Sequence, residues 1–327
     1  MKVLVTGGAG FIGSNFVRMS ISGSLPGLEN ADITVLDALT YSGTLTNLVS
    51  VKDSPKFTFI HGDIRDAETV RKAMSGQDAV VHFAAESHVD RSVADSRIFV
   101  DTNVLGTQTL LDQAVAQSLT RFVHVSTDEV YGSIEEGSWD EGQPLLPNSP
   151  YSASKAGSDL LARSYHVTHG LNVSITRCSN NYGPYHFPEK VIPLFVTNLL
   201  DGLTVPLYGD GLNVRDWLHV DDHCRGIALV LSSGGDGEIY NIGGGTELTN
   251  HELTHRLIAA TGRDESFIEF VTDRKGHDRR YSVAIDKIST ELGYCPEVSF
   301  SDGLAEVVRW YELNRWWWEP LKERAMK

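Results

Sequence analysis

Short apolar runs rich in β-branched residues alternate along the first half of the chain with longer amphipathic segments. Runs of this kind predict buried strands, at Val3–Val5, Ile33–Leu36, Phe57–Ile60, Ala79–Phe83, Phe122–Val125 and Val173–Thr176. The segments whose apolar residues recur at helical spacing are Ile12–Ser22, Ala67–Met74, Asn103–Gln117 and Ser152–His169. Because the two kinds of element alternate, the pattern predicts an α/β fold with a doubly wound parallel sheet covered by helices on both faces.

This alternation breaks down beyond residue 178, where prolines and glycines mark irregular loops between shorter elements. We expect a first domain over residues 1–178 and a smaller, mixed α/β lobe over residues 179–327. Two segments between residues 214 and 242, Val214–Leu218 and Glu238–Ile242, are candidates for strands that return to the first domain. Near the C-terminus, Trp316-Trp317-Trp318 follows the amphipathic segment Leu304–Asn314, which predicts a terminal helix packed on the core or on a partner chain.

The charge balance narrows the range of partners. Of the 327 residues, 28 are Lys or Arg and 43 are Asp or Glu, so the net charge is −15. Nucleic acids and membrane surfaces are polyanions that such a surface repels, and we expect neither as a partner. The three cysteines lie far apart and predict neither a disulfide framework nor a thiolate zinc site. The apolar start, Met1–Thr6, is too short for a signal peptide, and we expect a cytoplasmic protein.

A glycine-rich turn, Gly7-Gly8-Ala9-Gly10-Phe11-Ile12-Gly13, stands directly between the first predicted strand and the first predicted helix. Glycines in this setting let a pyrophosphate approach the N–H groups at the helix N-terminus. Asp37 ends the second strand, where a carboxylate can accept hydrogen bonds from both ribose hydroxyls of an adenosine and would repel a 2′-phosphate. The pattern therefore predicts NAD, bound by Gly7, Gly10, Phe11, Ile12, Gly13 and Asp37. Asp63-Ile64, after the third strand, either holds the adenine or forms an exposed turn.

Tyr151 and Lys155 are four residues apart and share one face of a predicted helix. A free Tyr has a pKa of about 10, whereas a nearby cation and an oxidised nicotinamide would lower that pKa. We therefore expect Tyr151, with Lys155 as its cation, to accept a hydroxyl proton from a substrate while hydride leaves the same carbon for NAD. The alternative is an ordinary packed Tyr beside an exposed Lys.

With both motifs in register, the chain resembles the extended short-chain dehydrogenase/reductase family over essentially its whole length. The resemblance implies a Rossmann domain that binds NAD(P) and a smaller C-terminal lobe that most often binds a nucleotide sugar. It also implies a homodimer formed through a four-helix interface, to which Asn103–Gln117 and Ser152–His169 would contribute. After the fourth strand, it places Ala84, Ala85 and Asn103, the last expected to open the next helix, at the cofactor, and Ser87 and His88 at the substrate.

The stretch Thr127-Asp128-Glu129, expected just past the fifth strand, separates subclasses of this family. The family's epimerases usually carry small uncharged residues after the first position. Two adjacent carboxyl groups are instead similar to the signature of its 4,6-dehydratases, whose substrate is dTDP-glucose. Such an enzyme is a lyase that oxidises C4, eliminates water between C5 and C6 and returns the hydride to C6. The resemblance therefore implies tightly bound NAD that is regenerated in each turnover.

Elimination needs a base for the C5 proton and an acid for the departing C6 hydroxyl. Adjacent carboxyl groups suit this pair of tasks because their mutual repulsion keeps one of them protonated. The residues alone do not assign the two roles, and the resemblance implies Glu129 as the base and Asp128 as the acid. Thr127 and Tyr151 can hydrogen-bond the C4 carbonyl oxygen and stabilise the enolate. A solvated acidic loop is the alternative interpretation of the two carboxylates.

The lobe must supply cations for a diphosphate, and the candidates are Lys190, Arg215, Arg274, Arg279 and Arg280. The dense basic and aromatic stretch 274–281 predicts an anion site. The resemblance places contacts with the nucleotide diphosphate at Asn180, Lys190, Val191, Pro206, Tyr208, Arg215, Asn250, Arg274 and His277, with Tyr281 as a further candidate. Asn250 precedes a helical run, so capping that helix is the alternative for it.

Three other functions remain open at this point. A nucleotide-sugar 4-epimerase shares the fold, NAD and the Tyr151/Lys155 pair but needs no acid pair. A decarboxylase would require a carboxylated sugar and cations at C6. A non-catalytic NAD-binding regulatory protein would not need the Tyr-Lys pair at all.

His82 and His124 lie in strand runs, where we expect core histidines with satisfied hydrogen bonds. We expect no metal site.

Overall fold

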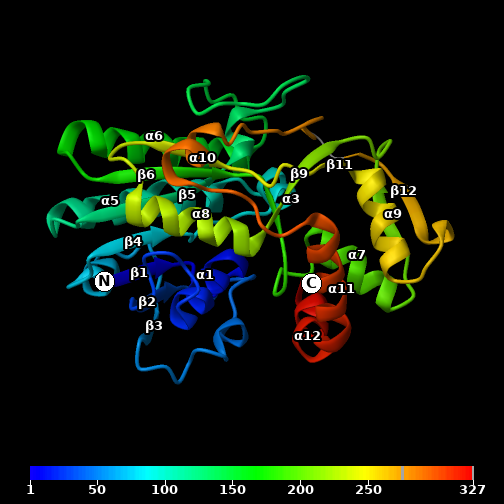
Figure 1. The fold of residues 1–327 in the computed structure, drawn as a ribbon, viewed down its shortest axis with the longest axis horizontal. Helices are drawn as coiled ribbons and strands as arrows, with labels where there is room; N and C mark the ends of the chain where they lie inside the picture. Colours follow the sequence, from blue (N-terminus) through cyan, green and yellow to red (C-terminus); the bar gives the residue numbers. More distant parts are fainter. Residues whose placement is uncertain (274–275, 326–327) are drawn as a thin grey trace.

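A seven-stranded parallel sheet forms the centre of the computed structural model, which describes residues 1–273 and 276–325 (Figure 1). In spatial order the strands are β3 (Phe57–His61), β2 (Asp32–Asp37), β1 (Lys2–Thr6), β4 (Ala79–His82), β5 (Arg121–Thr127), β6 (Val173–Cys178) and β10 (Ile239–Ile242). All neighbouring pairs are parallel. Because the chain order reverses between β1 and β4, this is the Rossmann topology, and the predicted fold class and its six strands are confirmed.

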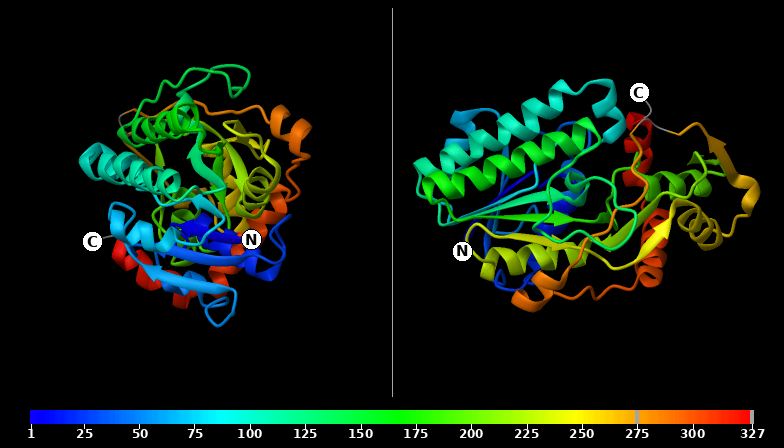
Figure 2. Two further views of the ribbon diagram at one scale, coloured as in Figure 1. Left: turned by 90° about the vertical axis from the view of Figure 1, so that its left-hand side faces the viewer. Right: turned by 90° about the horizontal axis from the view of Figure 1, so that it is seen from above.

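Helices cover both faces of this sheet, so the central strands are buried on both sides and tolerate continuous apolar runs. On one face lie α1 (Phe11–Ser22), α8 (Val220–Ser233) and α10 (Asp286–Leu292). On the other lie α2 (Ala67–Met74), α5 (Thr107–Ala116) and α6 (Pro150–His169). The right-hand view of Figure 2 shows α5 and α6 side by side. Among the described residues, no helix combines the length and the apolar character that crossing a membrane requires.

Two expected boundaries are wrong. The helix predicted from Asn103 begins earlier, because α3 (Val89–Ala94), α4 (Arg97–Phe99) and the π-helical turn η2 (Val100–Gly106) lead into α5, so Asn103 lies inside η2 and does not open a helix. Thr127 is the last residue of β5 and does not lie past it. A 3₁₀ turn, η3 (Asp128–Tyr131), follows directly and carries both predicted acids.

The smaller lobe has its own core, formed by α7 (Val191–Leu200), α9 (Asn250–Ala260), α11 (Phe300–Leu313) and α12 (Arg315–Ala325). Two small sheets complete it. One contains β7 (Asn180–Tyr182), β9 (Val214–His219) and β11 (Glu247–Thr249), and the other pairs β8 (Val205–Tyr208) with β12 (Ile268–Val271). Short 3₁₀ turns are η1 (Leu45–Leu48) and η4 (Glu265–Phe267).

The two candidate return segments behave differently. Glu238–Ile242 does return, because β10 pairs with β6 at the edge of the large sheet. Val214–Leu218 does not, because β9 pairs with β7 and β11 in the smaller lobe. At the C-terminus, Trp317 and Trp318 are buried in the lobe core while Trp316 remains 58% exposed, so the predicted packing of a terminal helix is confirmed.

Candidate active site

A cavity of about 490 Å³ lies between the carboxyl ends of the large sheet's strands and the smaller lobe. Most sequence-predicted site residues line it; Asn103, Arg279 and Arg280 do not, and Arg274 lies outside the described residues. On the side of the large sheet these are Gly7, Gly10, Phe11, Ile12, Gly13, Asp37, Asp63, Ile64, Ala84, Ala85, Ser87, His88, Thr127, Asp128, Glu129, Tyr151 and Lys155. On the side of the lobe they are Asn180, Lys190, Val191, Pro206, Tyr208, Arg215, Asn250, His277 and Tyr281.

The glycine turn forms a close-packed cradle at the start of α1. Gly7 has φ 70°, and a Cβ on Gly13 would lie 2.3 Å from the Gly7 carbonyl oxygen. Gly10 is the N-cap of α1, and among the described residues no side chain caps this helix. The N–H groups of its first turn therefore face the cavity without a capping side chain, which fits the diphosphate of a dinucleotide.

Asp37 stands at the end of β2 with its carboxylate 8% exposed. Its Oδ2 accepts a hydrogen bond from the Ala9 N–H at 2.8 Å, and its Oδ1 accepts one from the Leu39 N–H at 2.8 Å. Burial raises the pKa of Asp37, and these two backbone bonds oppose that rise. Each oxygen keeps further acceptor capacity for ribose hydroxyls. Asp63 forms an ion pair with Arg65 at 2.5 Å, and this hydrogen-bonded guanidinium lowers the pKa of Asp63.

The catalytic candidates Asp128 and Glu129 differ in their surroundings although they are neighbours in sequence. Asp128 is 2% exposed and Glu129 is half-buried. The Thr127 hydroxyl donates to Asp128 Oδ1 at 3.3 Å, while Asp128 Oδ2 has no hydrogen-bond partner among the described residues. Burial, followed by the charge of Glu129, raises the pKa of Asp128 well above its ordinary value. Asp128 is therefore the member of the pair that holds a proton near neutral pH.

Helix α6 brings Tyr151 and Lys155 to the end of β5. The helix starts with a capping box between Ser149 and Ser152 and with Pro150 at its first position, so Tyr151 lies in the first turn. Hydrogen bonding to the Thr127 side chain opposes the rise in the pKa of Tyr151. The Lys155 ammonium is 4% exposed and donates to the Val125 carbonyl oxygen at 2.9 Å.

The expectation that Lys155 lowers the pKa of Tyr151 is not met by the chain's own groups. Burial, and then the charge of Glu129, raises the pKa of Tyr151 well above its ordinary value. Burial also lowers the pKa of Lys155 to about 8. Tyr151 can therefore act as a base only with further positive charge beside it.

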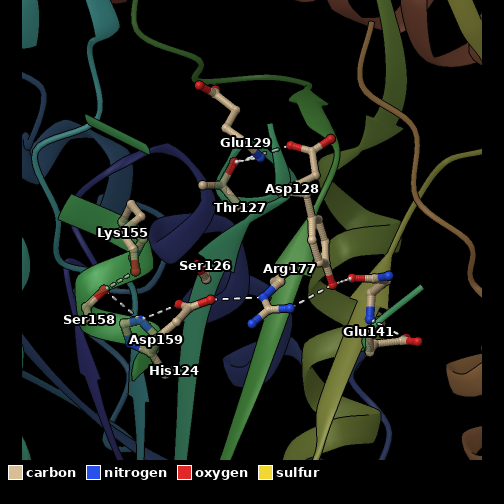
Figure 3. A network of polar contacts seen from close by, with 12 residues as sticks. His124, Ser126, Thr127, Asp128, Glu129, Glu141, Lys155, Ser158, Asp159 and Arg177 are labelled. Carbon is tan, nitrogen blue, oxygen red and sulfur yellow. Dashed lines mark hydrogen bonds and ion pairs between the residues drawn. The ribbon is translucent and has the colours of Figure 1, made fainter. Parts of the chain in front are cut away.

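A buried polar network beneath the cavity was not predicted from the sequence (Figure 3). Arg177 donates to Asp159 at 2.9 Å and to the Tyr131 hydroxyl at 2.8 Å, and that hydroxyl donates to Asn241 at 2.9 Å. Burial alone would raise the pKa of Asp159, but His124 and Arg177 hold it below its ordinary value. Tyr131 ends η3, so the network anchors the turn that carries the acid pair. The available signal was a charged residue, Arg177, in an otherwise uncharged strand.

The expected core histidines are only partly satisfied. His82 hydrogen-bonds the hydroxyls of Thr6 and Thr107 through its two ring nitrogens. His124 Nε2 contacts the Ser158 hydroxyl at 3.1 Å, but its buried Nδ1 has no partner among the described residues, so that half of the expectation is wrong. The ring faces Lys155, whose charge lowers the pKa of His124 further after burial.

Asn103 is 1% exposed and does not line the cavity, and its expected place at the cofactor stays a prediction. Its Oδ1 accepts from the Glu86 N–H at 2.8 Å, and its Nδ2 donates to the Glu86 carbonyl at 3.0 Å and to the Ser154 hydroxyl at 2.8 Å. Because all these bonds are internal, the side chain ties the loop after β4 to α6.

On the lobe side, Arg215 is 5% exposed and its guanidinium lies 4.3 Å from the centre of the Tyr281 ring. Lys190 donates to the Ser87 carbonyl at 2.8 Å, and His277 hydrogen-bonds Asp273 at 2.6 Å. The buried Asn180 Oδ1 has no partner among the described residues. These groups give the lobe side a set of cationic and polar atoms suited to a diphosphate.

One alternative interpretation and two expectations for the lobe need correction. Thr249, and not Asn250, caps α9, through a capping box with Glu252. Arg279 and Arg280 do not line the cavity, because they pair at the surface with Asp210 at 3.0 Å and with Glu247 at 2.6 Å. These acids lie on neighbouring loops and strands that sequence spacing does not bring together.

Comparisons with known proteins agree with this geometry. The family model described as GDP-mannose 4,6 dehydratase matches residues 4–307. A dTDP-glucose 4,6-dehydratase from Actinoplanes sp. is 62% identical over 97% of this chain and 100% of that protein. A crystal structure of DesIV, a dTDP-glucose 4,6-dehydratase from Streptomyces venezuelae with NAD and TYD bound, is 64% identical with a TM-score of 0.97, covering 98% of this chain and 100% of that chain. The crystal structure of a UDP-glucose 4-epimerase from Thermotoga maritima is 31% identical with a TM-score of 0.88. The match covers 96% of this chain and 100% of that chain.

Proposed function

The chain belongs to the extended short-chain dehydrogenases/reductases, in the family described as GDP-mannose 4,6 dehydratase, and from that membership we propose that it dehydrates dTDP-glucose to dTDP-4-keto-6-deoxyglucose. The observation that carries the proposal is the buried Asp128, whose pKa burial and the charge of Glu129 raise, beside Glu129 at the cavity. An epimerase that only inverts C4 has no use for such a pair. The similarity in sequence is also much higher to the dehydratases than to the epimerase.

We propose that the glycine turn and Asp37 hold NAD, the cofactor in the Streptomyces venezuelae structure. Bound NAD supplies the hydride acceptor at C4, a positive charge beside Tyr151 while oxidised, and the hydride that C6 later receives. Tyr151 accepts the proton of the C4 hydroxyl, and Lys155 adds its buried positive charge nearby. Burial raises the pKa of Tyr151, and the positive charge of the oxidised cofactor would oppose that rise.

The elimination uses the three residues at the end of β5. Thr127 and Tyr151 both line the cavity, and both can donate to the C4 oxygen while the enolate forms, a type of contact worth about 3 kcal/mol. Glu129 removes the C5 proton, and Asp128 protonates the departing C6 hydroxyl. This assignment agrees with burial, because the acid must hold a proton near pH 7 and Asp128 is the more buried of the two.

We further propose that Lys190, Arg215, His277 and the aromatic face of Tyr281 bind the nucleotide diphosphate. Arg274 remains a candidate from the sequence alone.

The test of the proposed function is to incubate the purified protein with dTDP-glucose without added cofactor. We expect a product lighter by one water that develops the alkali-induced absorbance of a 4-keto sugar, together with NAD in the protein by mass spectrometry. A product of unchanged mass with inverted C4 would contradict the proposal.

We also propose a cytoplasmic homodimer. Its interface would be the apolar surface of η2 and α6, where Leu105 is 50%, Leu160 58% and Val167 65% exposed. None of the three cysteines is paired in a disulfide, which suits a reducing compartment. Light scattering should give the mass of a dimer for the parent and of a monomer for Leu160→Glu. Leu203→Glu, on the lobe at 52% exposure, is the control that should stay dimeric. A monomeric parent would overturn the dimer.

A further inference from the structure

The buried side chain of Asn47 joins the glycine turn to the C-terminal helix. Asn47 lies in η1 and is 2% exposed. Its Nδ2 donates to the Ala9 carbonyl at 2.9 Å, and its Oδ1 accepts from Trp317 Nε1 at 2.9 Å. Trp317 belongs to α12 of the smaller lobe and is 3% exposed. A chain of two hydrogen bonds therefore runs from the lobe to the turn that faces the cofactor diphosphate.

The loop between β2 and η1 is held by the same helix. Thr40 and Tyr41 of this loop line the cavity on the Asp37 side. Near one end, Arg324 of α12 donates to the Thr40 carbonyl at 2.7 Å. At the other end of the loop, the Thr44 N–H donates to the Ala9 carbonyl oxygen at 3.1 Å. Asn47 donates to the same oxygen. Helix α12 thus bonds Thr40 of the loop through Arg324 and bonds Asn47 of η1, just past the loop, through Trp317.

The three consecutive tryptophans have different roles. Trp318 Nε1 donates to the Tyr311 carbonyl at 2.7 Å, a bond that stays within the lobe. Trp316 is exposed. Trp317 alone of the three reaches the nucleotide-binding domain through its indole N–H, and its ring packs against Tyr185 at 5.5 Å. The rings of Trp317 and Trp318 pack in the lobe core, and the bond of Trp317 to Asn47 in addition joins the lobe to η1.

We propose that Trp317 and Asn47 are positioning residues that retain the dinucleotide. By fixing the Ala9 carbonyl and η1, they keep the glycine turn and the loop closed around the cofactor and slow its release. The proposal rests on the proposed function, in which NAD stays bound between turnovers. Trp317 touches neither the cavity nor the reacting atoms, so its effect passes through Asn47.

The test compares Trp317→Phe with Trp318→Phe in the full-length holoenzyme. Both substitutions keep an aromatic ring and remove one buried indole hydrogen bond, so both should lower the melting temperature to a similar extent. We expect NAD to leave Trp317→Phe about 3- to 10-fold faster than the parent, as the loss of one buried hydrogen bond predicts, and Trp318→Phe at the parent rate. Release is followed as NAD appearing in the filtrate after dilution.

Arg324→Gln tests the second contact and keeps the proposal falsifiable if Trp317→Phe does not fold, because Arg324 is exposed. It should speed NAD release about 2- to 3-fold without changing the KM for dTDP-glucose. Equal release from the parent and the folded variants, or equal acceleration in Trp317→Phe and Trp318→Phe, would overturn the retention role alone. A parent that binds no NAD would overturn the proposed function as well.

Discussion

Burial separates two side chains that the sequence places side by side. Asp128 is almost fully enclosed, with one oxygen unpartnered among the described residues, and Glu129 is half-buried. A buried carboxyl is costly to ionise, so the proton of the pair resides on Asp128. The sequence predicts that one of the two is protonated, but which one depends on the depth of each side chain in the folded chain.

Asp128→Asn removes the proposed acid while leaving Tyr151 and Lys155 in place. We expect C4 oxidation to continue, so that reduced cofactor accumulates, and elimination to slow by about 10²- to 10⁴-fold. A substrate with fluoride in place of the C6 hydroxyl needs no protonation and should restore elimination. Stopped-flow absorbance of the reduced cofactor measures both effects, with the exposed Asp140→Asn as control. Failure of the fluorinated substrate to rescue Asp128→Asn would remove Asp128 from the acid role.

Lys155 makes stability depend on pH. Burial lowers its pKa from 10.5 to about 8, so the folded protein binds fewer protons than the unfolded chain between these values. Stability is therefore reduced below pH 8 and recovers as the pH rises, at a rate approaching about 1.4 kcal/mol per pH unit. Denaturation at pH 7 to 9.5 should show the parent gaining stability relative to Lys155→Met. If the difference in stability between the parent and Lys155→Met stayed constant over this pH range, Lys155 would not be a buried ammonium.

At the scale of elements, two junctions build the site. The capping box of α6 fixes where the helix starts, which brings Tyr151 and Lys155 against the end of β5. The network of Asp159, Arg177 and Tyr131 holds η3, which continues β5 and carries the acids. The site is rigid because both junctions are fixed by buried hydrogen bonds.

Arg177→Met should be severely destabilising because it leaves Asp159 buried without its main cation. Both members of that ion pair are at most 4% exposed, so we expect a loss of about 3–5 kcal/mol in the free energy of unfolding. Arg279→Met breaks an ion pair whose members are 55% and 57% exposed and should cost less than about 1 kcal/mol. Urea denaturation compares the two variants. Similar losses in both would show that the network does not hold the site.

The strands, most helix positions and the glycine turn could be predicted because each follows from local periodicity and spacing. The π-helical turn around Asn103 could not, since its shape comes from the bonds of Asn103 to Glu86 and Ser154. The ion pairs of Arg279 and Arg280 could not be predicted either. The same holds for the environment of Tyr151, because its pKa depends on burial and on Glu129. These features depend on partners distant in sequence or on depth in the fold.

At the scale of the whole molecule, the cavity joins two bodies with different tasks. The large sheet supplies the glycine turn and the acid pair, and the lobe supplies Arg215 and the ring of Tyr281. Residues of the lobe also affect the pKa of Asp128, because the charge of Asp216 on β9 raises it and the charge of Arg215 lowers it. Binding of the nucleotide diphosphate at Arg215 would therefore alter the pKa of Asp128.

The central claim is that two different bases of one cavity take the two protons, Tyr151 that of the C4 hydroxyl and Glu129 that of C5. Glu129→Gln tests it most directly, in a single turnover with dTDP-glucose in deuterated water. We predict that cofactor reduction proceeds at close to the parent rate, while deuterium does not enter C5 and no 6-deoxy product forms. Incorporation of deuterium at C5 and normal product formation in Glu129→Gln would contradict the account.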